Sequence, residues 1–558
     1  MIKILLSLFT AVVVFASSAL AQQSHLQNWY TLDAVSDTLH GISLNQAYQF
    51  LQNKKSTSVI VAVMDTGIDT TQEDLKEILW TNKKEIPGNG IDDDGNGYID
   101  DVHGWNFLGG RDGKNLLNDS YEAVRIYHNF KDKFLEKHLL PDTMCANTKR
   151  DFALWNKALK AIEVKPEEQI GLMYLEMAYK AARKNDEVLR NELQKEEYSV
   201  ADLEHLRPQT MQVRQAKFGY LTFLKVGDFD PDETNKTIFE QLDEYITDKK
   251  KAAIAKTVHP GNQRAAIVGD NYYDLNDRFY GNADVMGPAP MHGTHVSGII
   301  AAARNNNKGI NGIADNVRIM MIRALPNGDE YDKDVALGIR YAVDNGAKVI
   351  NMSFGKSISP QKKWVDEAIK YAEAHDVLLV HAAGNEAENT DSVDNYPSPV
   401  IDEASQTSVY NFITVGASSD PSITGGLVAD FSNYGPSTVD VFAPGVKIYS
   451  TLPGSNRYGY LKGTSMASPV VAGIAALIRS YYPQLSARQV KLIIERSVVM
   501  PDITASQRGN KNESDLSDKC KTGGVVNAYT SVKLAEVINA ENKKQQPAPV
   551  PQKTTAKQ

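Results

Sequence analysis

The sequence predicts an α/β fold in which a mainly parallel central sheet is covered by helices on both faces. Short apolar segments recur along the chain, and amphipathic helix-like segments separate several of them. The apolar segments show little polar alternation, which is typical of strands buried on both faces of a helix-covered parallel sheet. The expected strands are residues 59–65, 317–325, 348–355, 377–385, 412–418 and 439–445, with helices expected at 334–347 and 364–375.

Length and composition limit the class of protein without naming a function. The chain has 558 residues, of which 42% are hydrophobic and 23% charged, and its formal net charge is −9 at pH 7. This length is enough for more than one hydrophobic core, and the composition is that of an ordinary globular protein. Nucleic-acid-binding proteins usually carry a basic balance or a concentrated basic face. The acidic balance argues against that class.

The N-terminus predicts export. Lys3 precedes an apolar stretch at 4–15, and Ala19-Leu20-Ala21 supplies the small residues of a cleavage site. The apolar stretch is shorter than the roughly 20 residues that a membrane span needs, and no later segment fits a span. We therefore predict a signal peptide at 1–21 and a periplasmic or extracellular protein that begins at Gln22. No cysteine lies near the cut, so a lipid anchor there is not predicted.

The middle of the chain differs in pattern from the segments around it. Between about Leu116 and Val258 the sequence shows charged amphipathic helices without strand-like alternation. The C-terminal end is polar and proline-rich, which is typical of disorder. The expected units are an N-terminal extension at 22–58, an α/β domain formed by 59–115 and 259–540, a helical insertion at 116–258 within it, and a disordered tail at 541–558.

The first strand ends at Asp65, in the segment AVMDTGID. In pepsin-like aspartic proteases two Asp-Thr-Gly or Asp-Ser-Gly turns share a proton, because two close carboxylates do not both ionise. The chain contains no second turn of this kind, so a dyad built around Asp65 is not predicted. In parallel sheets ligands bind beyond the carboxyl ends of the strands, which is where Asp65 is expected.

A histidine begins the apolar helix predicted in MHGTHVSGIIAAA. At that position His292 is held by the helix while its ring can project into a cleft. Taken alone, such a histidine is more often a capping or packing residue. His292 and His295 also have a spacing that a metal pair would tolerate, but no third ligand cluster accompanies them. Zinc is therefore only a weak alternative.

Two further polar residues stand at the ends of predicted elements. Ser465 lies at the start of a helix in LKGTSMASPVVAGIAALI, and Asn385 follows an apolar strand in HAAGNE. A serine at a helix N-terminus is usually a cap, and an asparagine at a strand end is usually a turn residue. Backbone N–H groups at a helix N-terminus can also stabilise negative charge on a carbonyl oxygen. Together with Asp65 and His292, these residues form a coherent acyl-transfer site.

At this point the motifs show a family resemblance. The segments VMDTGID, HGTHVSGI, AAGN and GTSMASP resemble the signature segments of the subtilisin-like serine peptidases, and NMSFG, FSNYGP and FAPG follow in the expected order. The resemblance covers roughly 59–110 and 264–530 and implies a three-layer subtilisin-like fold. It implies that Asp65 orients the imidazole, that His292 is the general base and then acid, and that Ser465 attacks the carbonyl. Asn385 and the Ser465 amide would form the oxyanion hole, and His295 would be a helix-packing residue.

The resemblance also implies where a substrate binds. Ser353, Phe354 and Gly355 would pair with an extended peptide backbone, as an unpaired strand edge can. Ala383 and Gly384 would form a wall of the S1 pocket, and Asn395 would lie near its base. The implied activity is that of a secreted serine endopeptidase acting on proteins or peptides, and the oligomeric state is not predicted. The alternative is a catalytically silent binding protein whose helical insertion is the contact surface, which the intact set of four catalytic residues disfavours.

The acidic segment NGIDDDGNGYIDDVHGWNF predicts a structural calcium site. Aligned on an EF-hand loop, Asp92, Asp94 and Asn96 take positions 1, 3 and 5, and Gly97 gives the turn at position 6. The alignment fails at position 12, which is histidine instead of glutamate. The predicted ligands are Asp92, Asp94, Asn96, the carbonyl of Tyr98, Asp100 and Asp101. A solvated acidic loop without a metal is the alternative.

Three features depart from the family pattern or stay open. The extension before the core has only 37 residues between Gln22 and Ser58, so a separately folded inhibitory propeptide is expected to be absent or reduced. The insertion separates Asp65 from His292, so we expect it near the cleft, where it either narrows access or is an ornament. Cys145 and Cys520 are the only cysteines, and the sequence leaves open whether they pair.

Overall fold

A computed structural model describes residues 27–135, 145–227, 229, 233–402, 404–500 and 516–545. The predicted signal peptide lies outside these residues. Within them, no helix combines the length and the apolar character that crossing a membrane requires.

A seven-stranded sheet forms the centre of the molecule, and all of its strand pairs are parallel. This confirms the predicted α/β class. The strand order is β2-β3-β1-β4-β5-β8-β9. Each predicted strand is present, although several end earlier than expected, and the edge strand β2 was not predicted. The strands are β1 (Val59–Asp65), β2 (Gly104–Asn106), β3 (Val317–Arg323), β4 (Val349–Met352), β5 (Leu378–Ala382), β8 (Phe412–Ser418) and β9 (Val441–Pro444).

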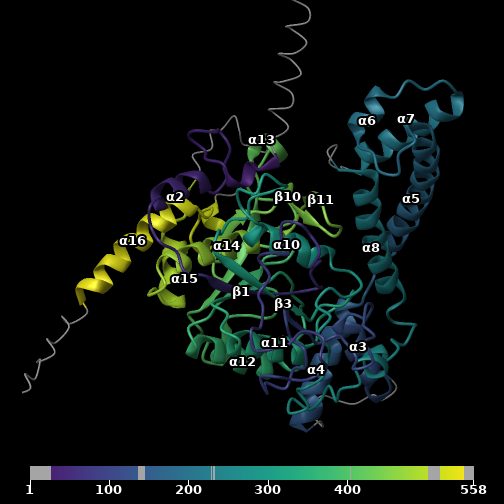
Figure 1. The fold of residues 1–558 in the computed structure, drawn as a ribbon. Helices are drawn as coiled ribbons and strands as arrows, with labels where there is room; N and C mark the ends of the chain where they lie inside the picture. The colour runs from purple at the N-terminus through teal and green to yellow at the C-terminus, as the bar shows by residue number, and fades with distance from the viewer. Residues whose placement is uncertain are drawn as a thin grey trace, which may run out of the picture.

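Helices cover both faces of this sheet (Figure 1). Alternate residues of β1 belong to different apolar clusters: Val61 and Val63 pack with α10, α14, α15 and α16, whereas Ala62 and Met64 pack with α11 and α12. The apolar runs in the sequence therefore arise because both faces of each central strand are buried. The helices are α10 (Met291–Ala301), α11 (Asp332–Asp344), α12 (Lys362–Ala374), α14 (Thr464–Tyr481), α15 (Ala487–Arg496) and α16 (Ala528–Gln545).

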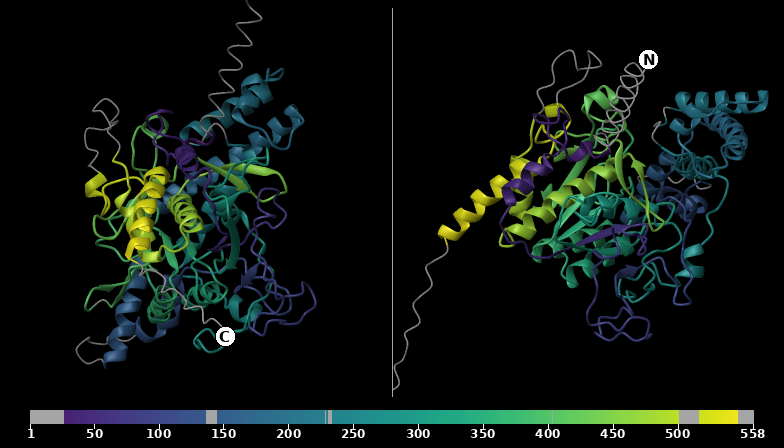
Figure 2. Two further views of the ribbon diagram at one scale, coloured as in Figure 1. Left: turned by 60° about the vertical axis from the view of Figure 1, so that its left-hand side comes forward. Right: turned by 45° about the horizontal axis from the view of Figure 1, so that its top comes forward.

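The N-terminal extension is part of the hydrophobic core. Trp29 is fully buried, and its Nε1 donates to the carbonyl of Val446 at 3.1 Å. Helix α2 (Leu44–Leu51) packs against α16, and the amide of Ala528 donates to the carbonyl of Ile42 at 2.7 Å. The extension therefore packs against the C-terminal part of the α/β domain, and Figure 2 shows α2 beside the C-terminal helix.

Helix α16 continues to Gln545, which corrects the predicted start of the tail at 541. The reason is local, because Lys543 and Lys544 in its last turn suit the negative end of the helix dipole. Residues 546–558 lie outside the described part. The remaining short elements are η1 (Trp29–Thr31), α9 (Gln263–Ile267), α13 (Pro421–Thr424), η3 (Leu516–Asp518), β6 (Val400–Asp402), β7 (Thr407–Ser408), β10 (Ile448–Leu452) and β11 (Arg457–Leu461).

The helices between β2 and α9 form two groups in the described part of the chain (Figure 1). We call α3 (Glu122–Phe134) and α4 (Ala146–Ala161) the anchored helices, because they lie against the α/β domain. We call the other group the tower, because it extends away from the domain in the views of Figures 1 and 2. The tower consists of α5 (Pro166–Leu193), α6 (Val200–His205), α7 (Met211–Val226) and α8 (Asn235–Ile254).

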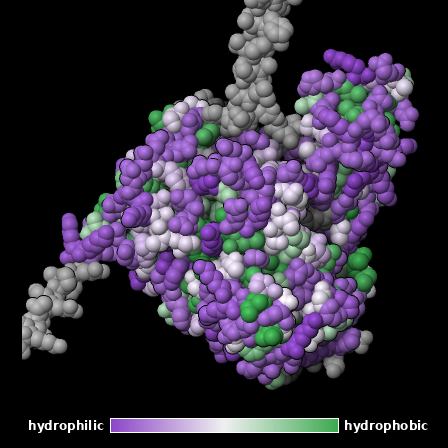
Figure 3. All heavy atoms as spheres, viewed as in Figure 1, coloured by the Kyte–Doolittle hydropathy of each residue, from purple (hydrophilic) through white to green (hydrophobic). Residues whose placement is uncertain are grey.

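Each group has its own apolar cluster. In the tower, Tyr220 and Phe239 are buried, and Leu175 and Tyr179 pack against them, whereas Leu172 is half-buried. The surface of the tower that faces the viewer in Figure 3 is mostly hydrophilic, consistent with its many Lys and Glu residues. Cys145 at the start of α4 is exposed and Cys520 is buried, and both are free thiols. The structure therefore contains no bridge between them.

Candidate active site

The carboxyl end of β1 and the first turn of α10 bring Asp65 and His292 together. Nδ1 of His292 lies 2.8 Å from Oδ1 of Asp65. The Asp65 side chain is fully buried and that of His292 is 29% exposed. The amide of Thr66 donates to the same carboxylate oxygen at 2.7 Å. A carboxylate that bonds Nδ1 favours the tautomer in which Nε2 accepts a proton.

This close approach of α10 to β1 depends on a glycine. A Cβ atom at Gly293 would lie 2.2 Å from the carbonyl oxygen of Gly67 and 3.0 Å from Cβ of Asp65. Any side chain at residue 293 would therefore push the helix away from the strand end. The HGTH pattern is thus explained by packing as well as by chemistry.

Ser465 is the second residue of α14 and follows Gly463, whose φ is +148°. Helix α14 packs against α10, the helix that carries His292. The half-buried Ser465 hydroxyl donates to the carbonyl of Ser353 at 3.1 Å. The first backbone amides of α14 lie at the positive end of the helix dipole. Ser465 thus combines a hydroxyl with a donor-rich backbone.

Asn385 lies three residues beyond β5 and is held by the residue before Ser465. Its Oδ1 accepts from the amide of Thr464 at 2.8 Å and from the Thr464 hydroxyl at 3.0 Å. Because the oxygen is occupied in this way, the Nδ2 end of the amide is oriented as the donor. Thr464 was missed by sequence reasoning, although it stands inside the quoted GTSMASP segment.

Comparison with known proteins decides the family. The model of the subtilase family matches residues 56–529. The chain belongs to the subtilase family. It is 44% identical over 223 residues to the thermophilic serine proteinase of Bacillus sp. (strain AK1), an alignment that covers 40% of this chain and 49% of that protein. The chain therefore spans about half the length of that relative.

Other subtilases show the same partial coverage of this chain. Thermitase of Thermoactinomyces vulgaris is 42% identical over 237 residues, which is 41% of this chain and 77% of thermitase. A solved protease structure from Pseudoalteromonas arctica PAMC 21717 is 28% identical with a TM-score of 0.37, covering 48% of this chain and 82% of that structure. The family of this chain is one of serine endopeptidases.

The segment expected to bind substrate follows β4 directly. The Ser353 hydroxyl donates to the carbonyl of Ser465 at 3.0 Å, and it lies 2.8 Å from the hydroxyl of Ser468. The residue is therefore tied to α14, while Gly355 two residues later is exposed. These bonds explain why β4 stops at Met352 although the apolar run continues to 355. We call Ser353–Gly355 the substrate edge.

The residues expected around the S1 pocket of this subtilase lie together. Nδ2 of Asn395 donates to the carbonyl of Ala383 at 2.9 Å, which links the predicted base to the predicted wall. Gly384 has a φ of +103°, and a Cβ there would lie 2.3 Å from Nδ2 of Asn433. Beyond the substrate edge, the backbone of Lys356 exchanges two hydrogen bonds with that of Tyr396, at 3.0 and 2.9 Å. The segment that follows the substrate edge is therefore joined to the segment of Asn395 through the backbone.

His295 is placed apart from His292 and its partners. The residue is buried, and its Nε2 lies 3.1 Å from the carbonyl of Ile448 and 3.2 Å from that of Gly459, on the β10–β11 hairpin. Burial lowers the pKa of His295 to about 3, so the ring is neutral at pH 7. Neither histidine belongs to a group of three potential metal ligands in the described part of the chain.

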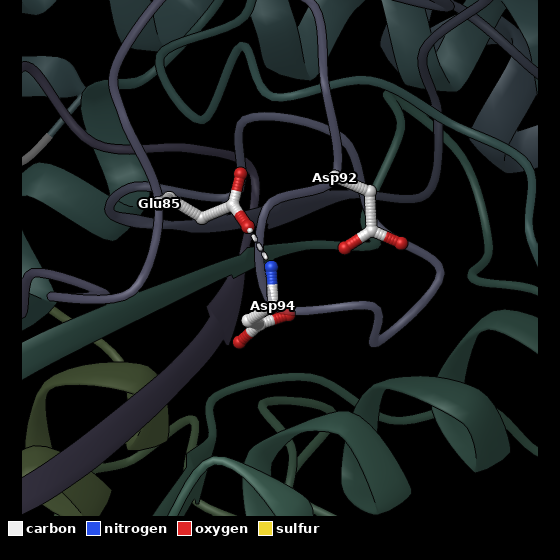
Figure 4. A group of neighbouring side chains, drawn as sticks. All are labelled: Glu85, Asp92 and Asp94. Carbon is white, nitrogen blue, oxygen red and sulfur yellow. Dashed lines mark hydrogen bonds between the residues drawn. The ribbon is translucent and has the colours of Figure 1, made fainter.

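Three carboxylates lie close together in and beside the acidic loop. Glu85, Asp92 and Asp94 each offer a carboxylate oxygen within 4.8 Å of the others (Figure 4). Asp92 and Asp94 are predicted ligands that belong to this group of carboxylates, and Glu85 joins them. Glu85 was missed because the EF-hand pattern is counted forward from Asp92. Oε1 of Glu85 accepts from the amide of Asp94 at 3.1 Å, which holds the carboxylate over the loop.

The remaining predicted ligands of the loop make other bonds. The carboxylate of Asp100 accepts from the amides of Gly88 and Gly90 at 2.7 and 2.9 Å, so it caps a neighbouring turn. Asp101 is fully buried and accepts from the Tyr341 hydroxyl at 2.7 Å. Burial raises the pKa of Asp101 to about 6. Oδ1 of Asn96 accepts from the amide of Tyr98 at 2.7 Å.

Proposed function

We propose that this subtilase is an exported endopeptidase that hydrolyses peptide bonds through Asp65, His292 and Ser465. The observation that carries the proposal is the 2.8 Å bond between a fully buried Asp65 and His292, together with a serine, Ser465, at the N-terminus of a helix that packs against the helix of His292. This arrangement of carboxylate, imidazole and hydroxyl serves acyl transfer in serine peptidases on several folds.

The chemistry starts at the Ser465 hydroxyl. Its oxygen attacks the carbonyl carbon of the substrate while its proton passes to Nε2 of His292, and Asp65 stabilises the imidazolium that forms. His292 then gives this proton to the leaving amine, which leaves an acyl group on Ser465. A water molecule attacks the acyl group by the same route and restores the enzyme.

The negative charge on the carbonyl oxygen needs two donors. The amide of Ser465 and Nδ2 of Asn385 are the candidates, because Thr464 holds the opposite end of the Asn385 amide. Donors that are fixed before the reaction stabilise the oxyanion without reorganising. Asn385→Leu is expected to lower kcat by about 100- to 1,000-fold with little change in KM, which is the effect that loss of this donor has in subtilisin.

A fluorophosphonate probe tests the nucleophile. Wild type is expected to be labelled covalently, and Ser465→Ala is expected to lose the label while keeping its melting temperature. Ser468→Ala, one helical turn later, is the matched control and is expected to keep the fluorophosphonate label. Labelling of Ser465→Ala, or no labelling of wild type, would contradict the assignment. Export is tested by sequencing the N-terminus of the mature protein, which is expected to begin at Gln22.

We also propose that Glu85, Asp92 and Asp94 hold a structural calcium ion. Three carboxylates gathered within 4.8 Å repel one another unless they are neutralised, and carboxylate oxygens are the ligands that calcium prefers. The ion would stabilise the loop between β1 and β2 and takes no part in the reaction. Calcium at 100 times its Kd is expected to stabilise the fold by about 2.7 kcal/mol.

Chelation tests this site. Wild type is expected to melt at a lower temperature in EGTA, and Glu85→Gln or the double variant Asp92→Ala/Asp94→Ala is expected to remove the difference. Asp112→Asn serves as the control, because Asp112 is an exposed carboxylate outside the group. An equal melting temperature of wild type with and without EGTA would show that the acidic loop holds no metal.

A further inference from the structure

The anchored helices contact the α/β domain beside the substrate edge. Lys356 is the residue that follows Gly355, and its side chain is only 2% exposed. Its Nζ lies 2.9 Å from Oε2 of Glu122, the first residue of α3. Nζ also lies 2.9 Å from Oδ1 of Asp332 and donates to the carbonyl of Glu330 at 2.8 Å. A single buried ammonium therefore joins the insertion to the end of the substrate edge.

The ion pair is firmly held on the insertion side. Arg125, one turn later in α3, donates to Oε2 of Glu122 at 2.8 Å, and the amide of Glu122 donates to Oδ2 of Asp329 at 2.7 Å. Burial disfavours the charged forms, but Arg125 and Lys356 lower the pKa of Glu122 to about 2. The neighbouring carboxylates, Glu122 foremost, raise the pKa of Lys356 above its usual value. Both partners are therefore charged at neutral pH.

Two other contacts place the same helices against both sides of the S1 region. Ile358, two residues beyond Lys356, is 2% exposed. It belongs to the apolar cluster of α3 and α4, which includes Trp155 of α4. On the opposite side, Lys157 of α4 forms an ion pair with Asp394, the neighbour of Asn395. Lys356 and Tyr396 exchange backbone hydrogen bonds, so the two segments that the anchored helices contact are bonded to each other.

The position of the substrate edge depends on what fixes its two ends. Ser353 is fixed by α14, through the carbonyl of Ser465 and the hydroxyl of Ser468. At the other end Gly355 is exposed, and Lys356 is the next residue with buried contacts. A peptide that pairs with this edge needs its backbone groups in register, so a shift of Gly355 weakens binding along the peptide.

We propose that Glu122 and Lys356 are positioning residues that hold the substrate edge in register, so that the helical insertion contributes to binding of extended peptides. The inference rests on the proposed function, because the edge matters only if the protein cleaves peptides. It assigns the insertion a role in binding the extended backbone of the substrate. It requires no direct contact between the insertion and the substrate.

The test compares substrates of different length. In Glu122→Gln and Lys356→Met, KM for a tetrapeptide anilide is expected to rise about tenfold with kcat within about threefold of wild type. Hydrolysis of a single-residue ester and the rate of fluorophosphonate labelling are expected to stay within twofold, because neither uses the whole edge. The double variant is expected to resemble Lys356→Met alone, since the two residues act through one ion pair.

Lys333→Met is the matched control. Lys333 is also fully buried and paired with a carboxylate, Asp270, at 2.7 Å, but it makes no bond to the substrate edge. It is expected to lower the melting temperature and leave the dependence on substrate length unchanged. If Lys356→Met does not fold, Lys356→Arg, which keeps the charge, is expected to fold and to have an intermediate KM. Glu122→Gln is then the variant whose KM for short and long substrates is compared with that of wild type.

Three results separate the possible outcomes. An unchanged tetrapeptide KM in both folded variants overturns the positioning role. A proportional loss of ester and tetrapeptide hydrolysis also overturns it, because that result describes general damage. Absence of labelling in wild type instead refutes the proposed function itself, and with it the chemistry on which this inference depends.

Discussion

The anchored helices and the tower come from one stretch of the sequence, yet they relate to the α/β domain in different ways. The anchored helices share a buried ion pair and an apolar cluster with the domain, through Glu122 and Ile358. The tower is built around a cluster of its own. Its contacts with the domain include Arg457, which is 24% exposed and lies 3.8 Å from Glu197. One inserted segment can therefore contain two helical groups, of which one shares buried contacts with the domain and the other has its own core.

The largest expected effect comes from removing the two units separately. Replacing residues 166–247 with a Gly-Ser linker removes most of the tower and is expected to leave cleavage of a small peptide within about twofold. Replacing the whole stretch 116–258 is expected to raise the KM for that peptide at least tenfold, because Lys356 loses its partner on α3. Steady-state kinetics of both deletion proteins give the two KM values for the small peptide. An equal KM in both would contradict the different roles of the anchored helices and the tower.

The same deletion proteins decide whether the tower narrows access to the cleft. If it does, its removal shifts the ratio of rates toward protein substrates over the small peptide. If the tower is an ornament, both rates stay in proportion. The ratio of casein to tetrapeptide hydrolysis is the measurement.

Cavities in the two apolar clusters give the next largest effect. Ile358→Ala is expected to destabilise the whole domain by about 3 kcal/mol and to raise the peptide KM, because Ile358 is a residue of the α/β domain that packs among the anchored helices. Phe239→Ala creates a cavity of similar cost in the tower cluster and is expected to leave peptide KM unchanged. Urea unfolding measures the loss of stability in each variant, and hydrogen exchange of the α3 and α5 amides shows which helical group has lost it. A changed KM in Phe239→Ala would show that the tower is coupled to the edge.

The pH dependence of stability is expected to sharpen the contrast on the anchored side. Burial raises the pKa of Glu330 from 4.5 to about 8, beside Lys356, which lowers it, and Asp329 and Asp332, which raise it. The folded state therefore holds a proton that the unfolded chain has lost. This contribution is complete below pH 4.5 and disappears as the pH rises to about 8, by at most about 1.4 kcal/mol per pH unit.

Glu330→Gln is expected to flatten the fall in unfolding free energy between pH 5 and 8. Urea denaturation at each pH measures it. Glu367→Gln, an identical change at an exposed position of α12, is the control. A parallel pH profile for Glu330→Gln and wild type would show that Glu330 is ionised in the folded protein.

The smallest effect is expected at the exposed ion pair of α4. Lys157 is 38% exposed and Asp394 is 54% exposed, so their pair is expected to contribute less than about 1 kcal/mol. Lys157→Met is expected to change peptide KM by no more than about twofold. Arg183→Met in the tower, which removes a similar pair with Asp243, is the control and is expected to leave KM unchanged. A tenfold change in Lys157→Met would transfer the anchoring role from α3 to α4.

The sequence predicted the central sheet well because its signal is local. The continuous apolar runs that end at Asp65 and contain Val349 and Leu378 follow directly from burial on both faces. The edge strand β2 was missed, because its three residues carry too little pattern to be recognised. Residues of the candidate active site were predicted from motifs, because Asp65 and His292 are 227 positions apart and only the fold brings them together.

The missed residues share a physical reason. Glu122 and Lys356 look like ordinary surface charges in sequence, and only their mutual burial makes them structural. Glu85 stands upstream of the loop that defines the metal motif, so a pattern read forward from Asp92 does not include it. Charge alone does not reveal burial, and the pairing of distant charges is decided by tertiary structure.

The packing of the N-terminal extension has a consequence for how the chain matures during synthesis. Trp29 bonds to Val446, 417 positions away, and the segment around Ile42 bonds to Ala528. Tyr48 of α2 also bonds the carbonyl of Ile313, so the segment waits for partners spread over several hundred residues. Since contacts between distant residues form late and slowly, the core around Trp29 and Ile42 is completed only after the segment around Ala528 has been made.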